Sequence, residues 1–224
     1  MSDKYLVSLS IGSGKMGAND KSKTKRAGPN GPIRSLNVNP KDIEYCVRAH
    51  YSHDINNVCV HCYMFNLLET CRQNCATAWS TNGYFLSKFR MDVKNAIEPP
   101  RKGDDIIRIY SGGEDANMTA VDNINRYVEL HDHVHFTKFT KRLDLMSHPD
   151  YYVPDNMTLI WSNPRIDDVK QYAPHYLIDG IFNVVRDHQD PRINCTPDTG
   201  ACRRCMNCYG TKKPRNRVIV EGLK

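Results

Sequence analysis

The sequence has no run that approaches the roughly 20 apolar residues of a membrane-spanning helix. Its first residues, from Met1 to Ser10, also lack the long apolar stretch of a secretory signal peptide. From these absences we expect a protein without membrane association, in the reducing cytoplasm. Nine cysteines in 224 residues would then serve as metal ligands and not as a disulfide framework, and their odd number excludes complete internal pairing.

A nucleotide-binding phosphate loop is absent too. Residues Gly12 to Lys15 read Gly-Ser-Gly-Lys, but the earlier glycine of the Walker pattern and the serine or threonine after the lysine are missing. The surrounding stretch is rich in glycine, asparagine and lysine, a composition typical of loops. We therefore expect residues 1–32 to form a flexible, basic N-terminal segment.

The chain carries little excess charge of one sign. Its 31 lysines and arginines exceed its 25 acidic residues, which gives a net charge of +6. Part of the excess lies in Lys15 to Arg26 and in Lys212 to Arg217. Two interpretations stay open: basic ends of this kind contact the phosphate backbone of nucleic acid, or they are solvated ends that keep a protein in solution.

Cysteine is concentrated in the tail, where four residues are separated by six, two and two others. A two-residue gap lets neighbouring thiolates converge on one metal centre, and bacterial ferredoxins use such a run for iron–sulfur clusters. Zinc is the alternative, because four thiolates also suit a tetrahedral Zn²⁺ ion. We predict that residues 191–224 form a metal-binding segment with a basic tail, with a [4Fe–4S] cluster favoured over zinc. The ligands would be Cys195, Cys202, Cys205 and Cys208.

A second group of cysteines follows the first strand expected in the main domain. Twelve residues separate Cys46 from Cys59, and two separate Cys59 from Cys62. Three thiolates would leave one iron of a [4Fe–4S] cluster open to a small molecule. The alternative is a zinc site made by Cys59 and Cys62 with Cys71 and Cys75. Cys71 and Cys75 stand four apart on an expected helix and are otherwise explained as core residues.

Between residues 33 and 190, expected strands alternate with expected helices. Such an order implies a parallel sheet with right-handed crossovers, so we predict an α/β fold, a partial (β/α) barrel. Chemistry in such sheets gathers at the C-terminal ends of the strands. The strands are expected at 33–39, 105–110, 133–140, 157–162 and 177–185, and the helices as two within 65–89 that break near Thr81, at 120–131 and at 167–172.

Two strand ends carry candidate cofactor-binding residues. Gly112 and Gly113 follow a buried strand and let the backbone approach a ligand, and Glu114 is suited to accept a hydrogen bond from an amine. A simple turn also explains the two glycines. Lys138 stands near the end of the next strand, where we expect a cation to face the barrel mouth and meet an anionic ligand.

These features together resemble the radical S-adenosylmethionine superfamily. The resemblance implies that Cys46, Cys59 and Cys62 hold a [4Fe–4S] cluster and that the strand end at Gly112 to Glu114 contacts the amino group of S-adenosylmethionine. The twelve residues before Cys59 exceed the three that this superfamily uses. More closely, the order of landmarks resembles a phage family known as gene product eighty-eight. The landmarks are Cys59-Val-His-Cys62-Tyr63, Ile107-Arg-Ile-Tyr-Ser-Gly-Gly113, Phe139-Thr-Lys141, Pro154-Asp-Asn-Met-Thr-Leu-Ile-Trp-Ser162 and the tail from Cys195 to Cys208.

The resemblance implies a radical enzyme that takes an electron from a donor and abstracts hydrogen from an unknown substrate. A phage origin would place it in the host cytoplasm and favour a nucleic-acid-related substrate. The tail cysteines would hold an auxiliary cluster or have a purely structural role. The alternative belongs to another class: a zinc- or cluster-stabilised module that binds nucleic acid or senses redox state without catalysis.

Overall fold

The computed structural model describes residues 5–11, 33–70, 73–195, 202–210 and 217–223. Seven strands form one sheet in the order of the sequence, β1 to β7. β1 pairs antiparallel with β2, and each later pair is parallel. The strands are β1 Leu9–Ile11, β2 Arg34–Leu36, β3 Ile106–Ile109, β4 His135–Thr140, β5 Met157–Ile166, β6 Gly180–Val185 and β7 Arg217–Gly222.

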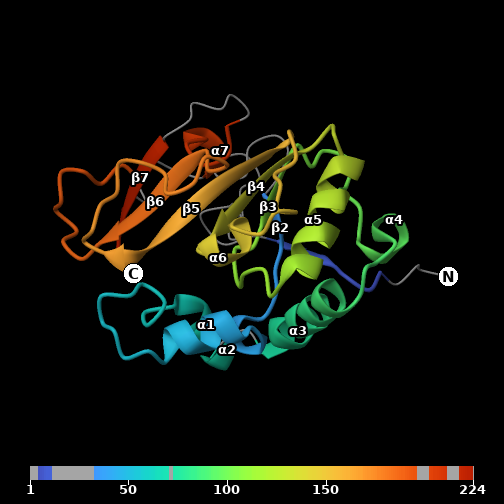
Figure 1. Ribbon diagram of the computed structural model, residues 1–224, viewed down its shortest axis with the longest axis horizontal. Coiled ribbons are helices and arrows are strands. Elements are labelled where there is room, and N and C mark those ends of the chain that lie inside the picture. Colours follow the sequence, from blue (N-terminus) through green and yellow to red (C-terminus); the bar gives the residue numbers. More distant parts are fainter. Residues whose placement is uncertain (1–4, 12–32, 71–72, 196–201, 211–216, 224) are drawn as a thin grey trace, which may run out of the picture.

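The helices lie between these strands, as parallel connections require. Figure 1 shows α1, α2 and α3 gathered along one side of the sheet, with α5 standing beside β3 and β4. None of the helices in the described ranges is long and apolar enough to cross a membrane. The helices are η2 Pro40–Asp42, α1 Glu44–His50, α2 Tyr63–Thr70, α3 Gln73–Lys88, α4 Val93–Ala96, α5 Met118–Leu130, α6 Leu143–Met146 and α7 Cys202–Cys205.

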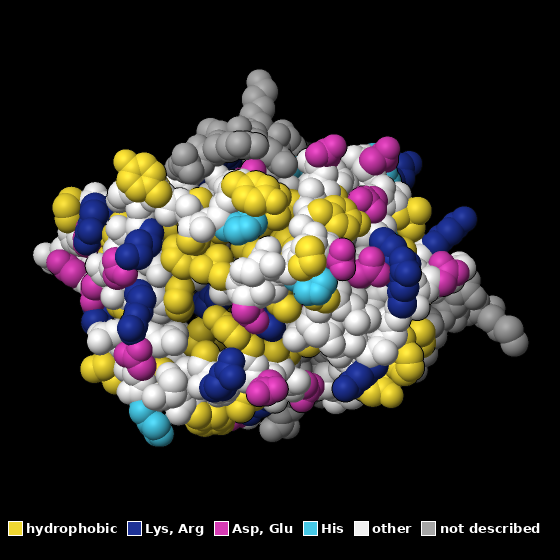
Figure 2. All heavy atoms as spheres, viewed as in Figure 1, with side chains coloured by type: hydrophobic (Ala, Val, Ile, Leu, Met, Phe, Trp, Pro, Cys, Tyr) yellow, Lys and Arg dark blue, Asp and Glu magenta, His cyan; other side chains and the backbone are white. Residues whose placement is uncertain are grey.

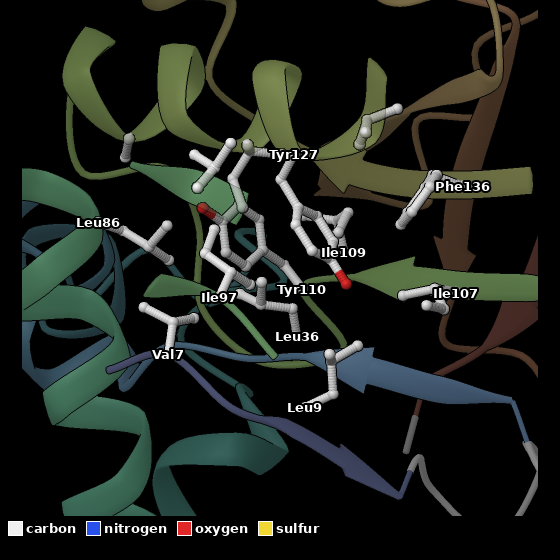
Figure 3. Close-up of a cluster of buried hydrophobic side chains, with 14 of the residues drawn as sticks. Val7, Leu9, Leu36, Leu86, Ile97, Ile107, Ile109, Tyr110, Tyr127 and Phe136 are labelled. Carbon is white, nitrogen blue, oxygen red and sulfur yellow. The ribbon is translucent and has the colours of Figure 1, made fainter. Parts of the chain in front are cut away.

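The main core lies between the sheet and α5. Apolar side chains of β2, β3 and β4, such as Leu36, Ile109 and Phe136, pack against Ile124 and Tyr127 of α5 (Figure 3). The helix begins at an Asn117 cap, whose side chain accepts a hydrogen bond from the Ala120 amide, and it turns an apolar face to the sheet. Alternate strand residues therefore face this core, and those between them face the opposite side.

The tail covers that opposite side. Tyr209 is buried against Ile33 and Ile106 at the beginnings of β2 and β3, and Cys202 and Cys208 pack beside them. The backbone of the tail is tied to the sheet as well, because the Thr137 hydroxyl donates to the Cys208 carbonyl over 3.2 Å. The described part of the cysteine-rich tail, residues 202–210, thus belongs to the folded domain and lies on the face of the sheet opposite to α5.

The prediction of an α/β fold with a mostly parallel sheet is confirmed. The expected break near Thr81 is wrong, because α3 runs unbroken from Gln73 to Lys88. The side chain of Asn82 is satisfied outside the helix by Ser8 and by the Asn37 carbonyl. A buried asparagine with tertiary partners need not end a helix.

The helix expected at 167–172 is also wrong. Asp167 has a φ of 66°, and two asparagine side chains hold the backbone that follows it. Asn163 donates to the Asp168 carbonyl over 2.6 Å, and Asn183 bonds both the amide and the carbonyl of Lys170. Backbone groups held by side chains in this way form a bend in place of a helical turn. Most of the basic segment expected at 1–32 lies outside the described residues.

Candidate functional site

A cavity of about 260 Å³ opens at the C-terminal ends of the strands and extends along the face of the sheet opposite to α5. Both cysteine groups reach it. Cys59 and Cys62 line it from the loop before α2, and Cys195, Cys202 and Cys208 line it from the tail. Gly112, Gly113 and Glu114, the expected cofactor-binding strand end, belong to the same wall. Segments that are far apart in the sequence therefore meet at one cavity.

Cys46 and Cys205 were expected as ligands but do not line the cavity, among the residues that the structure describes. Cys46 lies on α1 and packs against the main core. Cys205 ends α7, one turn after Cys202. Cys46, Cys59, Cys62, Cys75, Cys205 and Cys208 are free thiols.

The loop that carries Cys59 is held rigidly. The Asn57 side chain accepts from the Cys59 amide over 2.9 Å, and the Cys59 carbonyl accepts from the Cys62 amide over 3.2 Å. The loop is also fixed to the end of β5, because the Val58 amide donates to the Pro164 carbonyl over 2.8 Å. This turn brings Cys59 and Cys62 to the strand ends of the sheet.

The thiols of this first group share one electrostatic environment. Burial raises the pKa of Cys46, and the charges of Glu114, Cys59 and Cys62 raise it further. Burial also raises the pKa of Cys59, while the ammonium of Lys141 lowers it. The pKa of Lys141 is raised overall. Burial alone would lower this pKa, but the charges of Cys59, Glu114 and Cys62 raise it more. Lys141 therefore lies close to the first cysteine group and also to Glu114, whose Oε1 atom is 4.0 Å from the lysine Nζ.

The tail cysteines form a second group of the same kind. Burial raises the pKa of Cys208, and the charges of Cys195, Cys202 and Cys205 add to that rise. The guanidinium of Arg108 opposes it. Cys195 is anchored beside β7 by its amide, which donates to the Val220 carbonyl over 3.0 Å. Each cysteine group thus has one cation of the cavity wall beside it.

The donor chemistry of both groups fits a metal centre, since cysteine sulfur is the ligand of iron–sulfur clusters and of structural zinc, and a bound metal deprotonates the thiols that hold it. Within the described ranges, however, no three or more histidine, cysteine or carboxylate side chains are gathered closely enough to hold a metal ion as they stand. A bound metal would have to draw the thiols of either group closer together.

The strand end at Glu114 is tied to its neighbours. One carboxylate oxygen of Glu114 accepts from the Thr140 hydroxyl over 2.8 Å, and the other accepts from the Lys141 amide over 2.9 Å. Burial raises the pKa of Glu114, partly offset by the charge of Lys141. A buried carboxyl at a cavity wall can accept a hydrogen bond from an amine, as the sequence suggested.

Lys138 does not meet the expectation that it faces the cavity. Its side chain is 0% exposed, pairs with Asp115 and lies on the core face of β4 with Phe136. Because side chains alternate along a strand, Phe139 and Lys141 reach the cavity in its place. Alternation along β4 puts Lys138 and Lys141 on opposite faces, and the core contacts of Phe136 show that the face of Lys138 is the buried one.

Arg108, Tyr63 and Tyr209 also line the cavity, and sequence reasoning did not single them out as site residues. The Arg108 guanidinium lies 4.2 Å from the centroid of the Phe139 ring, and its Nη1 donates to the Tyr209 hydroxyl over 3.3 Å. Tyr63 is close enough to Arg108 for its phenol to influence the pKa of the guanidinium. Arg108 was hidden in the sequence inside an otherwise apolar strand.

Asn37 holds the turn at Ser111 and Gly112 in place. Its amide oxygen accepts from the Ser111 amide over 2.9 Å, from the Gly112 amide over 3.1 Å and from the Ser111 hydroxyl over 2.8 Å. Asn37→Ala would leave the amides of Ser111 and Gly112 without this acceptor, while the Ser111 hydroxyl could still donate to Ser35, so we expect the free energy of unfolding to fall by about 3 kcal/mol. Urea unfolding followed by circular dichroism measures this change.

A matched control is Asn95→Ala, since Asn95 is exposed and its amide donates only to Asp92. We expect that variant to change stability by less than about 0.5 kcal/mol. Equal stability of the two variants would contradict the anchoring role of Asn37.

Comparisons with known proteins add no relative: no family model, no curated protein and no solved structure matches the chain. Conclusions about function therefore depend on the geometry of the cavity and on the chemistry of the residues around it.

Proposed function

We propose that this chain is an iron–sulfur protein that acts as a radical S-adenosylmethionine-like enzyme in the cavity described above. The observation that supports the proposal is the meeting of two thiol groups and the strand end at Glu114 on one cavity. A purely structural metal site does not need a cavity beside it, whereas a reaction site needs a cavity in which the substrate binds.

The sequential order of parallel strands supports a partial (β/α) barrel as the scaffold, because each connection moves one strand onward in the same direction. In this proposal Cys46, Cys59 and Cys62 hold the first centre, and the tail cysteines hold the second. A cluster bound at the first centre would supply the single electron that cleaves S-adenosylmethionine, delivered by an external donor.

In this proposal the chain's own side chains balance charge and bind S-adenosylmethionine. Lys141 balances the negative charge of the first thiol group. Glu114, kept in place by Thr140 and by the Lys141 amide, would accept a hydrogen bond from the amino group of S-adenosylmethionine. Gly112 and Gly113 contribute only backbone to the wall beside Glu114, and the side chains of Met64 and Val38 pack against them.

The proposal is tested by the metal content of protein purified without oxygen. We expect about four irons and four acid-labile sulfides per cluster, and about eight of each if both groups are loaded. Added S-adenosylmethionine should then perturb the electron spin resonance signal of the reduced protein. Two zinc ions and no sulfide would reject the radical mechanism.

A zinc result would leave a binding module without catalysis as the better account. That alternative relied on basic ends, and nearly all of those residues lie outside the described ranges. On the face shown in Figure 2, lysine and arginine side chains are interspersed with acidic ones around a more hydrophobic middle. Among the described residues on this face, basic side chains do not form the continuous surface that would favour a nucleic-acid partner.

A further inference from the structure

Arg108 lies in the cavity wall without a carboxylate partner among the described residues. Its Nη1 donates to the Tyr209 hydroxyl, and its Nε is buried without any hydrogen-bond acceptor. The guanidinium stacks on the ring of Phe139, which fixes its plane. A planar, positively charged group is thereby held at the cavity.

Arg34 shows how this protein compensates a buried guanidinium elsewhere. Arg34 lies on the neighbouring strand and pairs with Glu98 over 2.6 Å and with Asp104 over 3.1 Å. Arg108 lines a cavity whose wall also carries the carboxyl groups of Glu114 and Glu221, and its guanidinium lies beside two phenols, a thiol and an aromatic ring. Burying a guanidinium without a counter-ion is costly, and among the described residues no carboxylate pairs with Arg108 as Glu98 and Asp104 pair with Arg34, so a bound anion would compensate the charge of Arg108.

The size of the cavity limits the nature of that anion. About 260 Å³ is near the lower end of the roughly 300–1,000 Å³ typical of ligand pockets. The guanidinium fork matches the two oxygens of a carboxylate or a phosphate. Ser111 lines the same cavity, and its hydroxyl donates to Asn37 and Ser35.

We propose that the cavity binds a small organic anion, whose carboxylate or phosphate group is held by Arg108. The inference deepens the proposed function, since this anion would be the substrate of the same site. Arg108 is then the residue that selects the substrate class. The competing explanation is that Arg108 only balances the charge of the tail thiols, because Cys202 is among its neighbours.

The test uses two anionic probes, glycerol 3-phosphate and succinate, each with a neutral counterpart, glycerol and succinamide. Binding is measured by calorimetry on the purified, metal-containing protein. We expect saturable binding of at least one anion and none of either neutral compound. The probe that binds more tightly distinguishes a phosphate substrate from a carboxylate substrate.

Three variants then assign the binding to Arg108. Arg108→Gln should raise the dissociation constant about tenfold or more, because a charge-assisted hydrogen bond is lost. Arg108→Lys keeps the charge without the fork and should have an intermediate effect. Arg90→Gln is the matched control, since Arg90 is 76% exposed and pairs with Asp122 away from the cavity.

The inference is overturned if neither anion binds the wild-type protein saturably, an outcome that requires no variant to fold. It is also overturned if Arg108→Gln binds the anion as well as wild type does. If Arg108→Gln lost metal but bound the anion as before, the role of Arg108 would be to balance the charge of the tail thiols. Arginine-dependent anion binding by a protein that contains only zinc would uphold this inference while rejecting the radical enzyme.

Discussion

Gly113→Ala is expected to lower the free energy of unfolding by about 4 kcal/mol, a large share of the roughly 5–15 kcal/mol of a typical domain. Two effects add. Gly113 has a φ of 88°, where an L-residue loses about 1–2 kcal/mol. An added Cβ would also overlap the Cγ2 atom of Val38 and lie 2.5 Å from the Val38 carbonyl oxygen, which a packed backbone cannot relieve.

Gly103→Ala separates these two effects. Gly103 has a φ of 96°, but a Cβ there meets no atom within 4 Å. This variant should therefore show only the conformational cost, about 1 kcal/mol. Guanidinium unfolding of both variants, with equal metal loading, makes the comparison.

Val38→Ala in the Gly113→Ala background tests the steric part of the argument. It removes the overlap with Cγ2 but leaves the overlap with the carbonyl oxygen, so we expect only partial recovery of stability. If Gly113→Ala were no less stable than Gly103→Ala, the close approach of the two strand ends would not matter for folding.

The contact at Gly113 also shows what the sequence could and could not reveal. A pair of glycines after a buried strand indicated a close approach, but the sequence did not show to what. The structure places the backbone of Val38 against Gly113 and the side chain of Met64 against Gly112. The glycines are thus explained by packing within the chain, beside any role toward a ligand.

The meeting of Cys59, Cys62 and Glu114 at one cavity could be anticipated, because the C-terminal ends of parallel strands share one edge of a sheet. The choice between Lys138 and Lys141 could not be made from position alone. Two lysines three residues apart face opposite sides of a strand, and only the core contacts of Phe136 decide which side is inside.

Other features depend on contacts between distant residues. Asn163 and Asn183 turn the backbone after Asp167 into a bend, although the local pattern favours a helix. The placement of residues 202–210 on the face opposite to α5 depends on the burial of Tyr209 against Ile33 and Ile106. No local periodicity in the sequence encodes either arrangement.

The largest functional effect is expected from the double substitution Cys59→Ser and Cys62→Ser. Both thiols line the cavity, and serine oxygen is a poor ligand for iron–sulfur clusters. Under the proposed function the iron content should fall from about eight to about four per chain, with sulfide falling in step. Cys205→Ser with Cys208→Ser should remove the other half and leave the first centre loaded.

Cys75→Ser is the matched control for the first centre. Cys75 packs in the same cluster as Cys62, beside Met64, Leu68 and Trp79, but it does not line the cavity in the described part of the chain. We therefore expect this variant to keep its full iron and sulfide content and to lose only a little stability, as a polar group enters an apolar cluster. Loss of one zinc ion from both Cys75→Ser and the Cys59, Cys62 variant would instead identify the four-cysteine zinc site, in which Cys46 has no part. If the Cys59→Ser, Cys62→Ser variant retained all of its metal, the loop before α2 would hold no metal centre. The radical mechanism would then lack the cluster that cleaves S-adenosylmethionine.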